Sequence, residues 1–328
     1  MKSWYPILKH LSDGRFHSGE QLAQHVGVSR TAIWKHIKRI EAETGLNIDS
    51  VKGRGYRLQY GLELLDESII KQQLSADADG FLAELVIEQV TESTNVLAAS
   101  APPLAIDRAK VWLAEHQTAG KGRRGRQWIS SFGSNLYLSM AWRFDLPMAE
   151  LAGISLVTGV CLSRVLSRLG LDGHGLKWPN DVLWQDRKLA GILVEAFGES
   201  DGPATAVIGI GVNCKLPLLA GEAIDQPWVD LESAGLNELS RNMLTGYLIN
   251  ELIDGCKLYA EQGLAGFVEE WSAYDLYNGK DVSIIAGTRR IDGVAQGIAA
   301  DGGIKVLTEH GERTFHAGEV SLRKEISV

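Results

Sequence analysis

The chain opens with apolar positions that recur every three or four residues, which is the spacing of short amphipathic helices. This spacing predicts one helix over residues 4–11 and a second after Ser18, where Gln21 completes a capping box. A third helix is predicted after Ser29, and a short turn at Gly27 separates it from the second. Two helices joined in this way predict a helix-turn-helix, whose last helix enters the major groove of DNA.

Two short stretches that suit strands follow, at 47–51 and 56–60, and the turn between them reads Lys-Gly-Arg-Gly. They predict a β-hairpin, which would be the wing of a winged helix domain. Polar side chains left outward on the third helix and at the hairpin tip suit contacts with bases and phosphates. The candidate DNA-binding residues are Arg30, Thr31, Lys35, Lys52 and Arg54. The alternative is a small helical domain that packs against another protein.

The pattern then alternates between apolar runs and helical spacing. Strands are predicted at 85–90, 109–114, 135–142, 182–184, 188–195 and 206–212. Helices are predicted at 66–74, 95–100, 151–169, 241–261 and 264–274. These elements predict an α+β central part.

From residue 280 the pattern changes to closely spaced short strands with glycine turns, which predict a small β-barrel. The strands are expected at 282–285, 289–294, 296–299, 304–308 and 312–316. The chain is therefore predicted to hold three domains, at residues 1–62, 63–275 and 276–328.

Charge is distributed unevenly along the chain. Residues 1–60 carry ten Lys or Arg and five Asp or Glu, whereas the remaining residues carry 23 and 36. A basic N-terminal segment joined to an acidic remainder predicts two binding partners that differ in the charge they require.

The composition also excludes some classes of protein. The three cysteines, Cys161, Cys214 and Cys256, lie far apart and form no C-x-x-C pair, so neither a disulfide framework nor a zinc site is expected. No apolar run of transmembrane length and no signal peptide are expected. The chain is predicted to be cytoplasmic and to bind no membrane.

A loop rich in glycine and cations lies between the strands predicted at 109–114 and 135–142. Its cations alternate with glycines: Gly120, Lys121, Gly122, Arg123, Arg124, Gly125 and Arg126. Glycine lets a ligand approach the backbone, and arginine offers a fixed fork of donors for carboxylate or phosphate. The loop therefore suits a site that holds two anions together. A solvated basic loop or a nucleic-acid contact is the alternative, and the spacing fits neither a Walker phosphate loop nor a dinucleotide fingerprint.

Three further motifs accompany this loop: Lys-Trp-Pro-Asn-Asp at 177–181, Arg-Lys-Leu-Ala-Gly-Ile-Leu-Val-Glu at 187–195 and Gly-Ile-Gly-Val-Asn at 209–213. Together with the loop they resemble the biotin–protein ligases, in the version with an N-terminal DNA-binding domain. The resemblance covers nearly the whole chain. It implies a winged helix-turn-helix, a central mixed-sheet catalytic domain of the biotin/lipoate ligase type and an SH3-like C-terminal barrel.

The resemblance also implies which residues form the site. Lys188 and Arg123 are implied to be catalytic, because their family counterparts contact the biotin carboxylate and the adenylate phosphate. The other residues implied to bind biotin or the adenylate are Ser93, Thr94, Asn95, Gln117, Gly120, Lys121, Arg124, Gly125, Gly209, Gly211, Asn213 and Trp228. Asn180 and Arg323 are implied as nucleotide contacts.

Three details of this assignment depend on the residues themselves. Lys121 stands where the family often has arginine, so the charge is kept without the planar fork. Gly209 and Gly211 lie two apart on a predicted strand and bare the same face, against which a flat ligand could lie. The alternative is tight packing of a neighbouring strand or helix on that face. Trp128 is expected either to pack under the loop or to be a core residue, and the core position is preferred.

The implied reaction has two steps, with ATP and biotin as substrates and Mg²⁺ accompanying the ATP. Biotin is first converted to biotinyl-5′-AMP, and biotin then passes to a lysine of the biotin carboxyl carrier protein of acetyl-CoA carboxylase. The adenylate-bound form is implied to dimerise, to bind operator DNA and to repress the biotin biosynthesis operon. No metal-ligating residues are assigned. The alternatives are a ligand-sensing regulator without ligase activity and a lipoate ligase.

Overall fold

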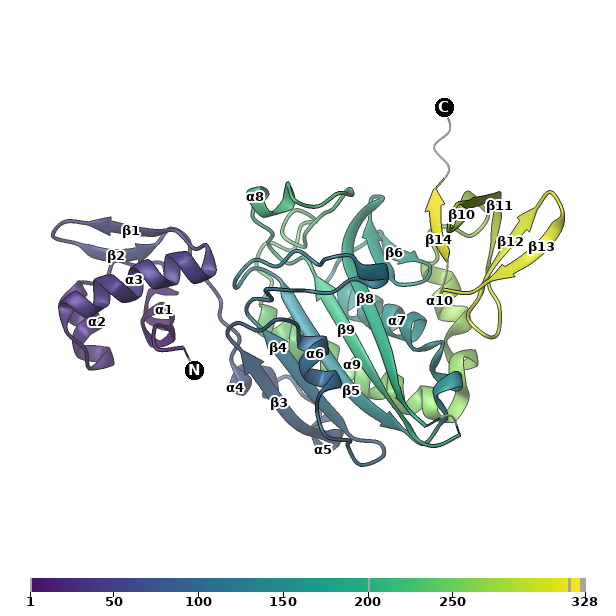
Figure 1. Ribbon diagram of the computed structural model, residues 1–328, viewed down its shortest axis with the longest axis horizontal. Coiled ribbons are helices and arrows are strands. Elements are labelled where there is room, and N and C mark those ends of the chain that lie inside the picture. Colours follow the sequence, from purple (N-terminus) through teal and green to yellow (C-terminus); the bar gives the residue numbers. More distant parts are fainter. Residues whose placement is uncertain (1, 200, 318–319, 325–328) are drawn as a thin grey trace.

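The computed structural model describes residues 2–199, 201–317 and 320–324. Three parts follow one another along the longest axis of the molecule (Figure 1). A small helical domain with a two-stranded hairpin lies at one end, a seven-stranded sheet with its helices lies in the middle, and a five-stranded sheet lies at the other end.

The N-terminal domain has the elements that the sequence predicts. Its helices are α1 (Tyr5–Leu11), α2 (Gly19–Val26) and α3 (Arg30–Thr44), and its hairpin consists of β1 (Ile48–Val51) and β2 (Gly55–Leu58). The predicted capping box of Ser18 and Gln21 is confirmed, and Gly27 ends α2 in the left-handed conformation at φ 70°. Glycine adopts this conformation without steric cost, so the short turn between α2 and α3 follows from the sequence.

The central sheet has the strand order β3-β4-β5-β9-β8-β7-β6. Its strands are β3 (Leu82–Glu88), β4 (Ala109–Ala114), β5 (Leu136–Phe144), β6 (His174–Lys177), β7 (Asp181–Trp184), β8 (Arg187–Gly198) and β9 (Ala204–Val212). The β3–β4 pair is parallel and the other pairs are antiparallel, so the sheet is mixed, as expected.

Helices cover both faces of this sheet. Val111 and Leu113 of β4 pack into the main core, whereas Trp112 between them packs with Ala98 on the opposite face. This alternation is the two-residue period of a strand. The main core lies against α7 (Ile154–Arg168) and α9 (Arg241–Gln262), while the short α6 (Thr94–Ala99) covers part of the other face (Figure 1).

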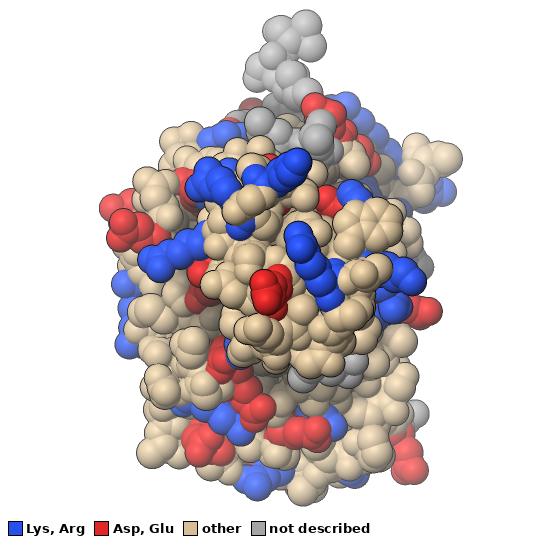
Figure 2. Space-filling view, turned by 90° about the vertical axis from the view of Figure 1, so that its left-hand side faces the viewer, with Lys and Arg blue, Asp and Glu red and all other residues tan. Residues whose placement is uncertain are grey.

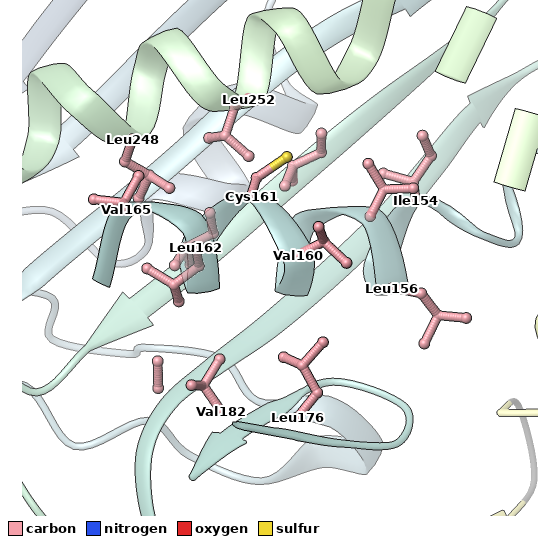
Figure 3. Close-up of a cluster of buried hydrophobic side chains, with 14 of the residues drawn as sticks. Ile154, Leu156, Val160, Cys161, Leu162, Val165, Leu176, Val182, Leu248 and Leu252 are labelled. Atoms are coloured by element: carbon pink, nitrogen blue, oxygen red, sulfur yellow. The ribbon is translucent and has the colours of Figure 1, made fainter. Parts of the chain in front are cut away.

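Helix α7 is the centre of the main core. Its apolar side chains pack on α9 through Leu248 and Leu252 and on the β6–β7 hairpin through Leu176 and Val182 (Figure 3). The expectation that no segment reaches transmembrane length was wrong. The segment Met148–Arg168, which contains η2 (Met148–Leu151) and α7, is long and apolar enough to cross a membrane, by length and composition only. However, 72% of its most apolar window is buried inside the structure, as in the core helix of a folded domain.

The C-terminal sheet is antiparallel, with the order β13-β12-β11-β10-β14. Its strands are β10 (Asp281–Ala286), β11 (Arg289–Ile298), β12 (Ile304–Thr308), β13 (Gly311–Phe315) and β14 (Val320–Lys324). The prediction of two strands over 289–299 was wrong, because β11 is continuous and contains a bulge between Ala295 and Ile298. A bulge interrupts the alternation of a strand, which explains the apparent break.

Other elements were missed or misplaced in the prediction. The remaining helices are α4 (Glu67–Lys71), α5 (Ala76–Phe81), η1 (Arg123–Gly125), α8 (Leu218–Gly221), η3 (Gly263–Phe267) and α10 (Val268–Tyr274). The helix predicted over 66–74 is the shorter α4, followed by the unpredicted α5. The strands β6 and β14 were also missed. Each of these elements is too short to show a clear period.

The N-terminal domain is joined to the central domain by buried contacts. Phe132 follows the basic loop but packs in the N-terminal core, where its ring meets that of Trp4 edge-on at a centroid distance of 6.0 Å. Glu115, which is 0% exposed, accepts hydrogen bonds from Leu65 N at 2.6 Å and from Arg241 Nη2 at 2.9 Å. The start of the basic loop, the interdomain linker and α9 are therefore fixed to one another.

Phe132→Ala is expected to lower the free energy of unfolding by roughly 3–5 kcal/mol, because it opens a cavity in a well-packed core. The measurement is denaturant unfolding, followed by tryptophan fluorescence and by far-UV circular dichroism. Phe197→Ala is the matched control, since that ring is 44% exposed whereas Phe132 is 2% exposed. Equal losses in the two variants would contradict the docking of Phe132.

Candidate functional site

The basic loop folds into a compact hairpin-like turn beside the central sheet. Trp128 N donates to Gly120 O at 2.9 Å, and Gly122 N donates to Arg126 O at 2.7 Å. At its tip Arg124 and Gly125 have φ values of 60° and 74°. The left-handed region is open to glycine and disfavoured for arginine, so the tip is held by the closing contacts around it.

Trp128 does not have the core position that was expected for it. Its half-buried indole ring lies on the sheet, against the bare backbone of Gly191 and Gly211, and any side chain at either glycine would collide with the ring. The indole Nε1 is buried and has no hydrogen-bond partner among the described residues. The interpretation of Trp128 as a core residue was therefore wrong, because the glycines of β8 and β9 let the ring form a wall of the site.

Two adjoining cavities lie between the loop and the sheet. The larger, of about 410 Å³, is bounded by the loop, by residues 177–181 and by the segment 223–228. The smaller, of about 50 Å³, lies over β8 and β9 and reaches the start of α6. The two cavities share a wall, formed by Gly122, Arg123, Trp128, Asn180 and Lys188. A ligand with two chemically different ends could therefore extend from one into the other.

The smaller cavity has a polar floor of connected side chains. Gln117 Oε1 accepts hydrogen bonds from Thr94 N at 2.8 Å and from Thr94 Oγ1 at 3.1 Å. Ser139 Oγ donates to Asn95 Oδ1 at 2.6 Å, and Asn95 Nδ2 donates to Glu195 Oε2 at 2.9 Å. This network fixes the orientation of the amide and hydroxyl groups that a polar ligand would meet.

Ser93 lines the same cavity at the N-terminus of α6 and is buried. Ser139 and Glu195, which hold Asn95 by hydrogen bonds from outside the cavity lining, were not predicted. Their signal in the sequence is a polar side chain within an otherwise apolar strand.

Gly209 and Gly211 bare the same face of β9, as expected, but other side chains of the protein lie against part of it. The space above Gly209 is filled by the Asn95 side chain, and that above Gly211 by Trp128. Both glycines nevertheless border the smaller cavity. Their role in this structure is to admit these two side chains, which a residue with a Cβ would exclude.

Arg123 connects the basic loop to two other segments. Its Nη1 donates to Asn180 Oδ1 at 3.0 Å, and its Nη2 donates to the carbonyl of Ala317 in the C-terminal domain. Asn180 Nδ2 donates in turn to Ile192 O of β8 at 2.8 Å. Burial lowers the pKa of Arg123, and the neighbouring Asp181 carboxylate opposes that shift. Arginine remains charged despite such a shift, so the site keeps a fixed cation.

Lys188 is the second fixed cation of the shared wall. Its Nζ lies 2.8 Å from Asp181 Oδ1 and 5.5 Å from the centre of the Trp128 ring. Asp181 belongs to the 177–181 motif, but nothing in the linear pattern pairs it with Lys188. The antiparallel pairing of β7 with β8 creates this contact, because it places Lys188 opposite Leu183, which is two residues from Asp181 along β7.

The segment beside Lys188 forms the far wall of the larger cavity. Lys188 N donates to Pro227 O at 2.9 Å, and Trp228 Nε1 donates to Gly221 O at 3.1 Å. Asn213 is 4% exposed, and its Nδ2 donates to Val229 O at 3.1 Å. Asn213 thus also holds the wall that carries Trp228.

The other loop residues take different positions. Gly120 is buried beside Trp128 and Gln117, and its lack of a side chain allows that approach. Lys121 borders the smaller cavity and Arg124 the larger, and both side chains are exposed. Gly125 lies at the loop tip.

Arg323 lies on β14 of the C-terminal domain, opposite Ser283, but its side chain is outside the described residues.

The assembled site has the chemistry of an anion-binding site. Lys121, Arg123, Arg124, Arg126 and Lys188 surround two connected cavities. Within residues 2–199, 201–317 and 320–324, no group of three His, Cys, Asp or Glu side chains is arranged to hold a metal ion. The arrangement can therefore hold two anionic groups close together, next to a small polar pocket.

The N-terminal domain presents a separate basic surface. Arg30, Thr31 and Lys35 are exposed on α3, and Lys52 and Arg54 are exposed at the hairpin. Seen from this end of the molecule, basic side chains gather over the upper half of the surface (Figure 2). The structure thus brings the predicted DNA-binding residues to one end, away from the two cavities.

The hairpin arginines stack on Phe16, which was not predicted to take part. The Arg54 guanidinium lies 4.0 Å from the ring centre, and that of Arg57 lies 4.6 Å from it. Arg57 also donates two hydrogen bonds to Asp49 Oδ2, at 3.2 and 2.6 Å. The stack limits the motion of Arg54 in advance of any binding.

The chain matches three protein families along its length. Residues 5–57 match the family described as HTH domain, residues 87–213 the biotin/lipoate A/B protein ligase family, and residues 278–323 the biotin protein ligase C terminal domain. The bifunctional ligase/repressor BirA proteins of Salmonella typhimurium and Escherichia coli are each 39% identical to it over 323 residues, which are 97% of this chain and 96% of theirs.

A solved structure has a similar fold. The biotin protein ligase from Aquifex aeolicus in complex with biotin and ATP aligns with a TM-score of 0.63 at 27% identity, covering 74% of this chain and 100% of that one.

Lys188→Met is expected to lower the free energy of unfolding by roughly 1–3 kcal/mol, because it leaves the Asp181 carboxylate without its partner. Adding Asp181→Asn to that variant should restore most of the loss. The measurement is a double-mutant cycle by denaturant unfolding.

Lys257→Met serves as the control, because Lys257 and Asp77 form a more exposed ion pair. The loss of stability in Lys257→Met should be much smaller than that in Lys188→Met, because solvent screens an exposed pair. Additive effects of the Lys188 and Asp181 substitutions would contradict a coupled pair.

Proposed function

The chain belongs to the biotin–protein ligases that carry an N-terminal repressor domain, and from this membership we propose that it activates biotin with ATP and transfers it to a protein. The acceptor we propose is a lysine of the biotin carboxyl carrier protein of acetyl-CoA carboxylase. The observation that carries the proposal is the pair of fixed cations, Arg123 and Lys188, in the wall shared by a small polar cavity and a larger one.

The smaller cavity is the proposed site of the biotin ring. The ureido group of that ring has N–H donors and a carbonyl acceptor, so it suits hydroxyl and amide partners. Ser93, Thr94, Asn95 and Gln117 supply such groups from the cavity wall. Gly209, Gly211 and Trp128 complete the pocket, and the indole has to shift or stack on the ligand as the cavity fills.

The larger cavity is the proposed site of ATP. Trp228 would cover the adenine ring, Asn180 and Arg323 would contact the nucleotide, and Arg124 with Gly125 would close the loop over the phosphates. Gly120 lets the loop backbone lie against Trp128 and Gln117, which line the smaller cavity, and Asn213 supports the wall that carries Trp228. Mg²⁺ enters with ATP as part of the substrate.

In the first step an oxygen of the biotin carboxylate attacks the α-phosphorus of ATP, and the bond from that phosphorus to the pyrophosphate breaks. The products are biotinyl-5′-AMP and pyrophosphate. Both reactants are anions, so Lys188, Arg123 and Lys121 would neutralise charge that concentrates in the transition state. Lys188 would leave Asp181 for the ligand oxygens.

In the second step the neutral amine of the acceptor lysine attacks the acyl carbon of the mixed anhydride. The C–O bond to AMP breaks, and the amine proton is lost as the amide forms. The ordered loop would keep water from the adenylate until the acceptor arrives.

The proposed division of labour follows three domains, at residues 1–62, 63–275 and 276–328. The first binds operator DNA through Arg30, Thr31, Lys35, Lys52 and Arg54. The adenylate-bound form dimerises, so that two winged domains bind a two-fold operator and repress the biotin biosynthesis operon. The three cysteines are free and buried, in keeping with a reducing cytoplasmic location.

Biotin-dependent exchange of pyrophosphate into ATP tests the first half-reaction. Wild-type protein with Mg²⁺ should show exchange with biotin and far less with lipoate. Lys188→Ala should lower the rate about a hundred- to a thousand-fold, which is the usual effect of removing one electrostatic contact to the transition state.

Lys257→Ala is the matched control, because Lys257 pairs with Asp77 on a part of the molecule remote from the loop. It should leave the exchange unchanged. Folded wild-type protein that shows no exchange with biotin would favour a ligand-sensing regulator, and exchange with lipoate alone would favour a lipoate ligase.

Arg54→Ala tests the proposed DNA-binding surface. The variant should bind duplex DNA more weakly, and the slope of log affinity against log salt should fall by about 0.9, the value for one phosphate contact. Fluorescence anisotropy over a series of salt concentrations measures both quantities. An unchanged slope would remove Arg54 from the phosphate contacts.

A further inference from the structure

Trp34 has an environment unlike that of the other tryptophans. The chain contains nine, and Trp34 alone is exposed, at 53%, whereas the others are buried or half-buried. Burying a tryptophan contributes strongly to stability, so an exposed ring is not explained by the folding of α3.

The position of Trp34 on α3 determines what can cover it. The inward side of the helix consists of Ile33, Ile37 and Ile40, which are buried in the N-terminal core. Trp34 lies on the outward side, one helical turn from Arg30 and from Lys38 (positions i−4 and i+4) and next to Lys35. Residues at this spacing share a face. The indole is therefore an exposed apolar patch flanked on α3 by Arg30 and by Lys38, whose ammonium group pairs with Glu41 at 2.8 Å.

Such a surface matches the major groove of DNA more closely than it matches a protein. The cations suit the phosphates that flank the groove. Trp34 is the fifth residue of α3, and the N-terminal part of a recognition helix is the part that contacts base edges. The groove exposes one apolar group, the 5-methyl of thymine.

We propose that Trp34 is a specificity-determining residue of the DNA-binding surface and contacts thymine methyl groups in the operator. This inference rests on the proposed DNA binding and adds what that function leaves open, namely which base is read and by which side chain. Arg30 and Lys35 hold the helix in the groove, and the indole ring selects positions that carry a methyl group.

The test uses full-length protein with biotin, ATP and Mg²⁺, and a duplex that the wild-type protein selects from a random-sequence pool. Each thymine of that duplex is replaced in turn by deoxyuridine, which lacks only the methyl group. Trp34→Gln removes the apolar ring, and Trp34→Leu keeps an apolar side chain. Circular dichroism and thermal unfolding check that both variants are folded.

Wild-type protein should lose about three- to ten-fold in affinity at one or two thymines of each half-site, the size expected for one buried methyl group. Trp34→Gln should bind more weakly and show no further loss at those positions, whereas Trp34→Leu should keep part of the discrimination. Binding to an unrelated duplex at low salt should be the same in all three.

The uracil pattern is the set of positions at which replacing thymine by deoxyuridine weakens binding. An unchanged uracil pattern in Trp34→Gln would overturn the inference and leave the proposed DNA binding intact. Loss of dimerisation with an intact uracil pattern would likewise overturn it, and would assign the ring to a contact with a second copy of the chain. Wild-type protein that binds no duplex in a salt-dependent manner would overturn both proposals.

Discussion

The fixed position of the Arg123 guanidinium is the constraint on which the rest of the site depends. Four cations within one short loop repel one another, and the glycines between them leave the backbone free to move. Arg123 counters both effects by donating to Asn180 in the turn before β7 and to the carbonyl of Ala317 in the C-terminal domain. Trp128 adds an apolar anchor on the glycines of β8 and β9. The loop thus becomes a wall with a defined shape, and the two cavities exist because of it.

The same loop is tied to the N-terminal domain. Glu115 at its start is held by Arg241 and by the backbone of the linker, and Phe132 at its end is buried beside Trp4. A change in the loop therefore acts on both domains through packed side chains and a buried ion pair. Contiguous contacts of this kind can couple a ligand site to a distant surface, and the strength of such coupling is a free energy.

Much of this organisation follows from the sequence, and its exceptions have physical causes. The helices and the hairpin of the N-terminal domain were predicted because caps, glycines and apolar spacing agree there. The central strands were predicted because buried strands are continuous apolar runs. Short elements such as β6 and α5 were missed because they lack a period, and β11 was divided because its bulge interrupts one.

The residues of the site were named through motifs and a family resemblance. Their partners, Asp181, Ser139 and Glu195, were not named, since strand pairing brings them into contact and a linear pattern does not contain that pairing. The occupants of the space above Gly209 and Gly211 could not be read from the sequence for the same reason.

The hydrogen bond between Arg123 and Ala317 spans 194 positions of the chain. Domains made early in synthesis fold while later ones are still being added. A nascent chain can therefore complete its winged domain, and can dock Phe132 into it, long before Ala317 has left the ribosome. Its basic loop stays without its C-terminal anchor throughout that time. The order of synthesis thus postpones a finished active site until Ala317 has been made, and a chain truncated before Ala317 would carry a folded N-terminal domain on an unfinished enzyme.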